Sequence, residues 1–171
     1  RKLIERGLEV DGRIMSVEDI DRMFRDFIDY YAAHIADASR PFEGLESALD
    51  QLSARGFHFA VCTNKLEGLS VRLLQALDLA KYFGAVIGPD TINVAKPDPA
   101  PYLETMKRLG VPARQSIMIG DSETDILTAR AAGVPVIGVT FGYTQKPVAT
   151  YNPDYLVSHF DEVWDILKLK R

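Results

Sequence analysis

Cysteine and histidine are scarce in this sequence of 171 residues, which contains one cysteine and three histidines. The single thiol, Cys62, cannot form an internal disulfide, and such usage is typical of the reducing cytoplasm, where we expect this protein to work. Cys62 lies in an apolar run with no base beside it, so we interpret it as a core residue. The histidines His34, His58 and His159 lack the spacing of metal ligands, and a zinc site is not expected.

An excess of basic residues is also lacking. Lysine and arginine number 20 against 24 aspartate and glutamate residues, for a formal net charge of −4 at pH 7. This balance argues against a nucleic-acid partner, which usually requires a basic patch. No apolar run approaches the roughly 20 residues that a membrane span needs, so no membrane partner is expected. The first residue is Arg1 rather than methionine, no signal-peptide pattern follows, and the opening residues have the pattern of a helix interior.

Hydrophobic residues make up 47% of the sequence and charged residues 26%. Disordered, collagen-like and disulfide-stapled chains have other compositions and are excluded. A chain of this length buries roughly 70% of its unfolded surface, which suffices for one domain with a small appendage. The composition carries no signal for an oligomeric state.

Residues 1–40 are helical in pattern. Ser16, followed three residues later by Asp19, has the form of a capping box at a helix start. The apolar residues between positions 20 and 31 recur at helical spacing along one face. A shorter helix is expected around residues 3–8, and no strand is expected in this segment.

From Pro41 onwards, apolar runs alternate with helical patterns. The runs expected to form strands are 57–62, 85–88, 116–120, 134–139 and 155–157. The segments expected to form helices are 45–54, 69–77, 99–109, 124–132 and 162–167. Continuous apolar strands separated by helices indicate an α/β fold with a largely parallel, Rossmann-like sheet and helices on both faces. We therefore divide the chain into a helical segment at 1–40 and an α/β body at 41–171.

Polar residues follow three of these strands, and in such sheets the active groups lie just beyond the carboxyl ends of the strands. Thr63 and Asn64 follow the first strand, and Lys96 lies in the loop after the second. Asp121 and Asp125 follow the third. We expect a hydroxyl, an amide, a lysine and two acids to converge on one crevice.

Asp121 and Asp125 give the most specific indication of a functional site. Gly120 lets the chain turn directly at the strand end, and acids four residues apart can both face the strand tips if a helix begins between them. Hard oxygen ligands of this kind suit Mg²⁺, so we expect Asp121 and Asp125 to bind it together with phosphate oxygens of a substrate. The plainer alternative is that Asp121 or Ser122 only caps the following helix.

The other three residues also have two interpretations each. Lys96 is either a solvated loop cation or a fixed charge that offsets phosphate and carboxylate charge. Thr63 and Asn64 either form a turn or hold phosphoryl oxygens through side chains and backbone N–H groups. Gly138 and Gly142 lack the third glycine of a dinucleotide-binding loop, so no dinucleotide cofactor is expected.

Taken in order, the three clusters resemble motifs two, three and four of the haloacid dehalogenase superfamily. As written in this sequence they are Thr63-Asn64, Lys96-Pro97 and Gly120-Asp121-x-x-x-Asp125. The surrounding residues look most like the phosphoglycolate phosphatase branch of that superfamily. The resemblance covers residues 41–171, and residues 1–40 look like part of the helical cap inserted early in that fold.

The resemblance implies a role for each residue. Thr63 would bind the transferring phosphoryl group with help from the backbone N–H of Asn64, and Lys96 would neutralise negative charge. Asp121 would hold Mg²⁺, and Asp125 would support the metal site or orient Lys96. In this superfamily the phosphoryl group passes to the first aspartate of a D-x-D-G-[TV] motif at the end of the first strand, and water then cleaves the aspartyl phosphate.

That D-x-D-G-[TV] motif is absent from the 171 residues. The nearest sequence, Glu9-Val10-Asp11-Gly12-Arg13, has glutamate in place of the nucleophile and follows no apolar strand, so we interpret it as a cap loop. The expectation is an N-terminally truncated chain. The missing strand would lie centrally in the sheet, and its neighbours would be left without a ladder partner.

The leading hypothesis is a Mg²⁺-dependent phosphatase that acts on a small phosphorylated metabolite, with phosphoglycolate as the first choice. This activity is expected of the full-length protein, and negligible turnover is expected of the present chain. Two alternatives stay open. One is another enzyme of the same fold, such as a pyrophosphatase or a phosphosugar mutase, and the other is an inactive binding module.

Overall fold

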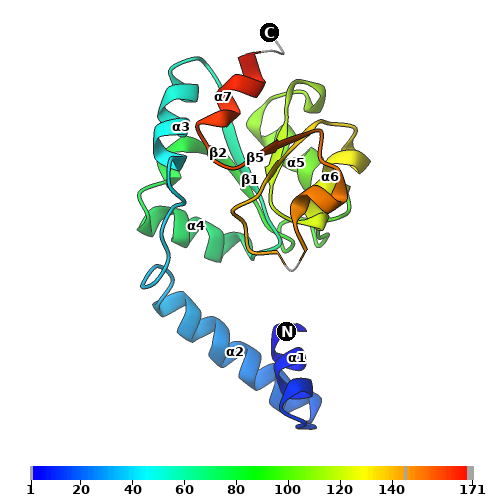
Figure 1. Ribbon diagram of the computed structural model, residues 1–171. Coiled ribbons are helices and arrows are strands. Elements are labelled where there is room, and N and C mark those ends of the chain that lie inside the picture. The colour runs from blue at the N-terminus through cyan, green and yellow to red at the C-terminus, as the bar shows by residue number, and fades with distance from the viewer. Residues whose placement is uncertain (1, 145, 169–171) are drawn as a thin grey trace. The chain divides into compact units, whose positions relative to one another are not determined.

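The computed structural model describes residues 2–144 and 146–168 (Figure 1). The chain divides into two compact units, residues 1–39 and residues 40–171. No helix among the described residues has the length and apolar character needed to cross a membrane.

The first unit consists of the helices α1 (Lys2–Val10) and α2 (Val17–Ala33). The hydroxyl of Ser16 accepts a hydrogen bond from the backbone N–H of Asp19, so α2 begins where the capping pattern predicts. The described part of this unit contains no strand, as expected. None of the residues of α2 is fully buried, so this helix contributes little core of its own.

The second unit alternates strands and helices in the order expected from the sequence. Its strands are β1 (Phe59–Cys62), β2 (Phe83–Ile87), β3 (Met118–Gly120), β4 (Val136–Val139) and β5 (Tyr155–Val157). Its α-helices are α3 (Leu45–Ser53), α4 (Glu67–Ala76), α5 (Ala100–Leu109), α6 (Glu123–Ala132) and α7 (Glu162–Leu167). The α/β fold class is therefore confirmed. Three short 3₁₀ helices, at 80–82, 113–115 and 148–151, escape sequence prediction because turns this short carry no periodic signal.

The strands β1 and β3 each begin two residues later than predicted, at Phe59 and at Met118. The apolar residues Phe57 and Ile117, which precede them, still pack against the core. An apolar run therefore marks the buried stretch of the chain, whereas the strand bounds depend on ladder hydrogen bonds. This difference explains the early start that the sequence pattern predicts.

Among the described residues every strand pair is parallel, as predicted, but the strands form two sheets instead of one. In the first sheet β1 pairs with β2, and in the second β4 lies between β3 and β5. Among the described residues, no strand pairs with the remaining sides of β1 and β3. Both strands are therefore edge strands, with one row of backbone N–H and C=O groups outside any ladder.

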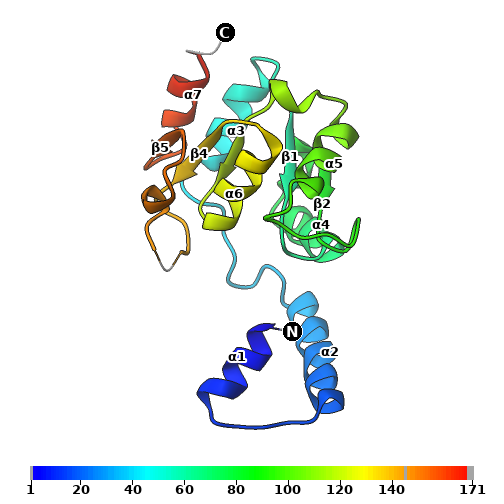
Figure 2. The same cartoon turned by 90° about the vertical axis from the view of Figure 1, so that its right-hand side faces the viewer.

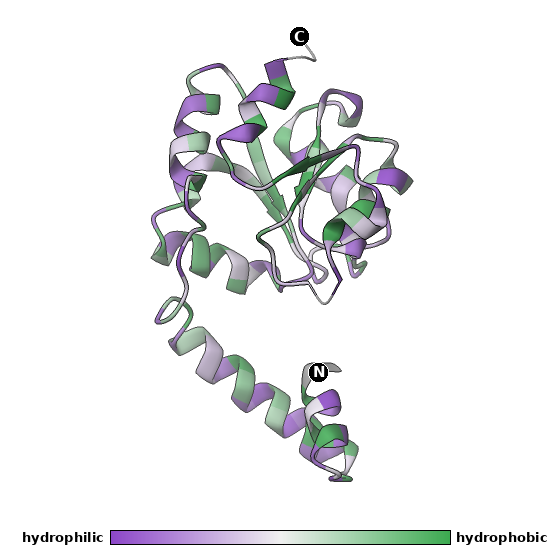
Figure 3. Ribbon diagram, in the orientation of Figure 1, coloured by the Kyte–Doolittle hydropathy of each residue, from purple (hydrophilic) through white to green (hydrophobic). Residues whose placement is uncertain are grey.

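Helices cover both faces of the second sheet, and each face packs against its helices in a separate hydrophobic cluster. Val136 of β4 packs with side chains of α5 and α6, whereas the next residue, Ile137, packs with side chains of α3 and α7. Successive residues of a strand point to opposite faces, which accounts for this division. Figure 2 shows the helices around the strands, and Figure 3 shows that the strands are among the most hydrophobic parts of this unit.

Candidate active site

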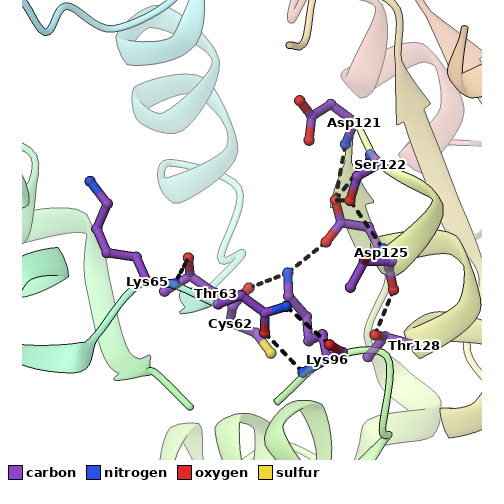
Figure 4. Close-up of polar contacts among 10 residues, drawn as sticks. Cys62, Thr63, Lys65, Lys96, Asp121, Ser122, Asp125 and Thr128 are labelled. Carbon is purple, nitrogen blue, oxygen red and sulfur yellow. Dashed lines mark hydrogen bonds and ion pairs between the residues drawn. The ribbon is translucent and has the colours of Figure 1, made fainter. Parts of the chain in front are cut away.

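Lys96 links the carboxyl ends of the two sheets (Figure 4). Its ammonium donates a hydrogen bond to the backbone carbonyl of Cys62, the last residue of β1, at 2.8 Å. It also donates to Oδ1 of Asp125, in the first turn of α6, at 2.5 Å. Both side chains of this ion pair are only 9% exposed. Lys96 is therefore a fixed, buried cation and not a solvated loop residue.

The side chain of Asn64 holds the backbone of the Lys96 loop. Its Nδ2 donates to the carbonyl of Lys96 at 3.0 Å, and its Oδ1 accepts from the Lys96 N–H at 2.9 Å. The Lys96–Pro97 peptide bond is cis. The amide of Asn64 thus positions the loop, a role that spacing in the sequence does not reveal.

Asp125 is engaged through both oxygens. While Oδ1 pairs with Lys96, Oδ2 accepts from the hydroxyl of Ser122 at 2.7 Å and from the backbone N–H groups of Asp121 and Ser122 at 3.2 Å each. Ser122 in turn accepts from the backbone N–H of Asp125, which completes a capping box at the start of α6. The capping alternative is therefore confirmed for Ser122, and Asp125 belongs to both the cap and the ion pair.

The Asp125 carboxylate lies so close to position 120 that a glycine is required there. A Cβ at position 120 would lie 2.6 Å from Oδ2 of Asp125 and closer still to other atoms of that side chain. A larger residue would push Asp125 away from Lys96. Close packing, and not only freedom to turn, explains a glycine at the end of β3.

Asp121 stands apart from these contacts. Its half-buried carboxylate accepts a hydrogen bond at Oδ2 from the backbone N–H of Tyr143, at 2.9 Å. Figure 4 shows the Asp121 carboxylate outside the contacts that join Lys96, Asp125 and Ser122. The two acids therefore occupy different environments, although their spacing suggested a shared one.

Thr63 follows β1 and forms a local turn, as one interpretation of the sequence expected. Its hydroxyl oxygen accepts from the backbone N–H of Lys65 at 3.1 Å, and its own N–H donates to the carbonyl of Ile87 in β2 at 3.0 Å. As an acceptor in this turn, the hydroxyl keeps its proton for donation.

The described residues contain no group of three or more histidine, cysteine, aspartate or glutamate side chains able to hold a metal ion. Mg²⁺ is nevertheless often held by one or two carboxylates, with water and substrate phosphate completing its shell. Asp121 fits such a site because its contact with Tyr143 uses one carboxylate oxygen. Asp125 fits it less well, since Lys96 and Ser122 occupy both of its oxygens.

A cavity of about 850 Å³ lies between β1 and β3. Ile119, in the middle of β3, borders this cavity and is 40% exposed, although strands of covered parallel sheets are normally buried. The cavity is lined mainly by apolar side chains from both strands and from α3, α5 and α7, among them Leu49, Phe59, Cys62, Met106 and Val163.

Burial raises the pKa of the Cys62 thiol above its ordinary value, and the nearby Lys96 ammonium opposes part of this shift. A raised pKa keeps the thiol protonated at neutral pH, and a protonated thiol is a poor nucleophile. This agrees with the interpretation of Cys62 as a core residue. Its backbone carbonyl, which binds Lys96, is the part that contributes to the site.

Comparison with known proteins gives consistent matches. The haloacid dehalogenase-like hydrolase family model matches residues 2–139. Phosphoglycolate phosphatase from Mesorhizobium japonicum is 42% identical over 161 residues, which are 94% of this chain and 71% of that protein. Phosphoglycolate phosphatase from Agrobacterium fabrum is 43% identical over 160 residues, which are 94% of this chain and 69% of that protein.

The fold is also similar to a solved structure, that of a predicted phosphoglycolate phosphatase from Haemophilus somnus. The two superpose with a TM-score of 0.89 at 27% sequence identity, over 95% of this chain and 73% of that one. The matches extend over both units of the chain.

Proposed function

Because the chain belongs to the haloacid dehalogenase-like hydrolase family, we propose that it carries most of the active site of a Mg²⁺-dependent phosphatase. The proposed substrate is a small phosphorylated metabolite, with phosphoglycolate as the first candidate. The observation that carries the proposal is the buried Lys96 ammonium, fixed between the end of β1 and Asp125. The phosphoglycolate phosphatases among its relatives support the choice of substrate.

Lys96 supplies fixed positive charge at the reacting group. An ammonium has three N–H donors, and the Cys62 carbonyl and Asp125 take two of them. We assign the third to an oxygen of the transferring phosphoryl group. Catalysis of phosphoryl transfer is mostly positioning and charge stabilisation, so a cation held in place before the substrate arrives is effective.

Thr63 and Asn64 are assigned to the same phosphoryl group. The Thr63 hydroxyl has a proton to donate, and the backbone N–H of Asn64 is the second donor that the family resemblance implies. The Asn64 side chain is already bonded to the Lys96 backbone, so it contributes by holding the lysine loop in place.

Asp121 is assigned as the metal ligand of this chain. A bound Mg²⁺ would neutralise charge on the phosphate and help to orient it. Asp125 is assigned to orienting Lys96, because that ion pair and the capping box already occupy both of its oxygens. Of the two roles that the resemblance implies for Asp125, this one fits the observed hydrogen bonds.

The nucleophile of the proposed reaction would come from a further strand, for which the cavity between β1 and β3 has room. Such a strand would pair with the free edges of both neighbours and bury its apolar side chains against both helical layers. An aspartate at its carboxyl end would then enter the space beside Lys96. There it would accept the phosphoryl group as an aspartyl phosphate, which water hydrolyses.

The test adds such a strand, as a synthetic peptide of five or so apolar residues ending in D-x-D-G-T or as an N-terminal fusion. Phosphate release is measured from phosphoglycolate, pyrophosphate and sugar phosphates, with and without Mg²⁺. We expect Mg²⁺-stimulated release with phosphoglycolate preferred, and negligible release from the chain alone.

Two controls make the result interpretable. A peptide with asparagine in place of the first aspartate should bind but not support turnover, and the Lys96→Met chain should be inactive with either peptide. Protection of the Cys62 thiol, which lines the cavity, reports whether the peptide is bound. A bound D-x-D-G-T strand with no Mg²⁺-stimulated phosphate release from any substrate would contradict the proposal.

A further inference from the structure

The loop after β4 holds the carboxylate of Asp121. The backbone N–H of Tyr143 donates a hydrogen bond to Oδ2 of Asp121. Hydrogen bonds to a carboxylate are stronger than hydrogen bonds between neutral groups. The loop lies beyond residues 2–139, which the family model matches. It also lies outside the three strand-end clusters.

Gly142 makes this contact possible. A Cβ at position 142 would overlap the Asp121 side chain and would lie 2.5 Å from its Cγ. Gly142 does not have the positive φ found at Gly110 and Gly133, so backbone conformation does not require glycine here. The requirement is the close approach of the loop to the carboxylate.

Aromatic rings hold the loop in place. The ring of Phe42 lies 5.1 Å from the ring of Phe141 and 5.6 Å from that of Tyr143, measured between centroids. Phe141 also lies 5.0 Å from Phe160 and packs against the core. Tyr143 itself is 91% exposed, so its own burial cannot anchor the loop.

We propose that residues 141–143 are the positioning element of Asp121 and that Phe42 fixes this element. The metal-related part of the inference rests on the proposed function, in which Asp121 binds Mg²⁺. Groups that hydrogen-bond to a metal ligand fix its orientation and tune its affinity. Phe42 is the third residue of the second unit, so the orientation of Asp121 depends on the segment that follows the helical unit in the chain.

The first test needs no metal. Exchange of the Tyr143 amide hydrogen with water is measured by solvent-exchange NMR in the 171-residue chain. We expect Asp121→Ala to raise the exchange rate about tenfold, as loss of a charge-assisted hydrogen bond implies. Phe42→Leu, which keeps the bond but loosens the loop, should raise it roughly two- to fivefold.

Gly68→Ala is the matched control, because no atom lies within 4 Å of a Cβ there and its φ is not positive. It should leave the Tyr143 exchange rate unchanged. An unchanged rate in Asp121→Ala overturns the role of the loop. An unchanged rate in Phe42→Leu overturns the role of Phe42.

The second test measures Mn²⁺ binding by electron paramagnetic resonance and the thermal unfolding midpoint of the same samples. Gly142→Ala should weaken Mn²⁺ binding at least fivefold with little change in the midpoint, and Gly68→Ala should bind like the parent chain. Equal affinity of Gly142→Ala and the parent overturns the inference. If the parent itself does not bind Mn²⁺, the metal assignment in the proposed function fails, and the exchange experiment still decides whether the loop holds Asp121.

Discussion

Strands β1 and β4 are both four-residue apolar strands of the same unit, yet only β4 is buried. All four residues of β4 are buried, whereas every residue of β1 is only partly buried. β4 has a strand on each side, and β1 has one on a single side. Both strands are apolar, but only the strand with a neighbouring strand on each side is fully buried. Burial of an apolar strand therefore depends on its lateral partners as well as on its composition.

The same comparison bears on the candidate site. The free sides of β1 and β3 border the cavity, and Lys96 connects the two sheets at their carboxyl ends through Cys62 and Asp125. This bridge, formed by the contacts of Lys96 with Cys62 and Asp125, lies at the strand ends, and among the described residues no ladder joins β1 to β3.

The largest expected effect tests whether lateral partners determine burial. Ile137 of β4 is 0% exposed and Ile119 of β3 is 40% exposed. Ile137→Ala should lower the free energy of unfolding by about 4 kcal/mol, because it removes buried methyl groups and leaves a cavity. Ile119→Ala should cost about 1 kcal/mol, since its side chain already borders open space. Urea unfolding measures both losses, and equal losses would contradict the dependence of burial on lateral strand partners.

A somewhat smaller effect tests the bridge between the sheets. Lys96→Ala leaves the buried Asp125 carboxylate without its cation, and we expect a loss of about 3 kcal/mol in the free energy of unfolding. Lys107→Ala is the control, because the ammonium of Lys107 pairs with Glu104 on an exposed helix face. It should cost less than about 0.5 kcal/mol. Similar losses in the two variants would show that the ion pair does not join the sheets.

The smallest effect concerns the Cys62 thiol, which borders the cavity. Burial raises its pKa, so the thiolate fraction at pH 7.5 falls below that of an ordinary cysteine. Reaction with a disulfide reagent should be about tenfold slower than in urea-unfolded chain and should accelerate as the pH rises above 9. Lys96 lowers this pKa, so Lys96→Met should slow the reaction further. The chain has one cysteine, so the signal comes from a single site.

Most of the fold was predictable because its signals are local. Helix starts and ends follow capping residues, as at Ser16 and Ser122, and left-handed glycines, as at Gly110 and Gly133. Apolar runs located the five strands that the structure describes in the second unit. The division into two sheets was harder to read, because strand pairing depends on residues far apart in the chain.

For the candidate site, the closeness of Lys96 and Asp125 was predictable, but the individual contacts were not. Strand-end position singled out Thr63, Lys96 and Asp125, because parallel strands bring their carboxyl ends together. The loop that holds Asp121 was missed, since its contact is made by a backbone N–H and by the absence of a Cβ at Gly142. A glycine soon after a strand was the only trace of it in the sequence.

Sequence alone determined the alternation of strands and helices and the residue types that lie at the strand ends, because periodicity and turn chemistry act over a few residues. The parallel direction of the strands followed from that alternation, whereas which strands pair did not. Only the tertiary structure separated the two acids, pairing Asp125 with Lys96 and placing Asp121 against Tyr143. Spacing did not distinguish these two carboxylates, and the family resemblance left Asp125 with two alternative roles. Their environments differ because their hydrogen-bond partners include groups distant in the chain, Lys96 for Asp125 and Tyr143 for Asp121.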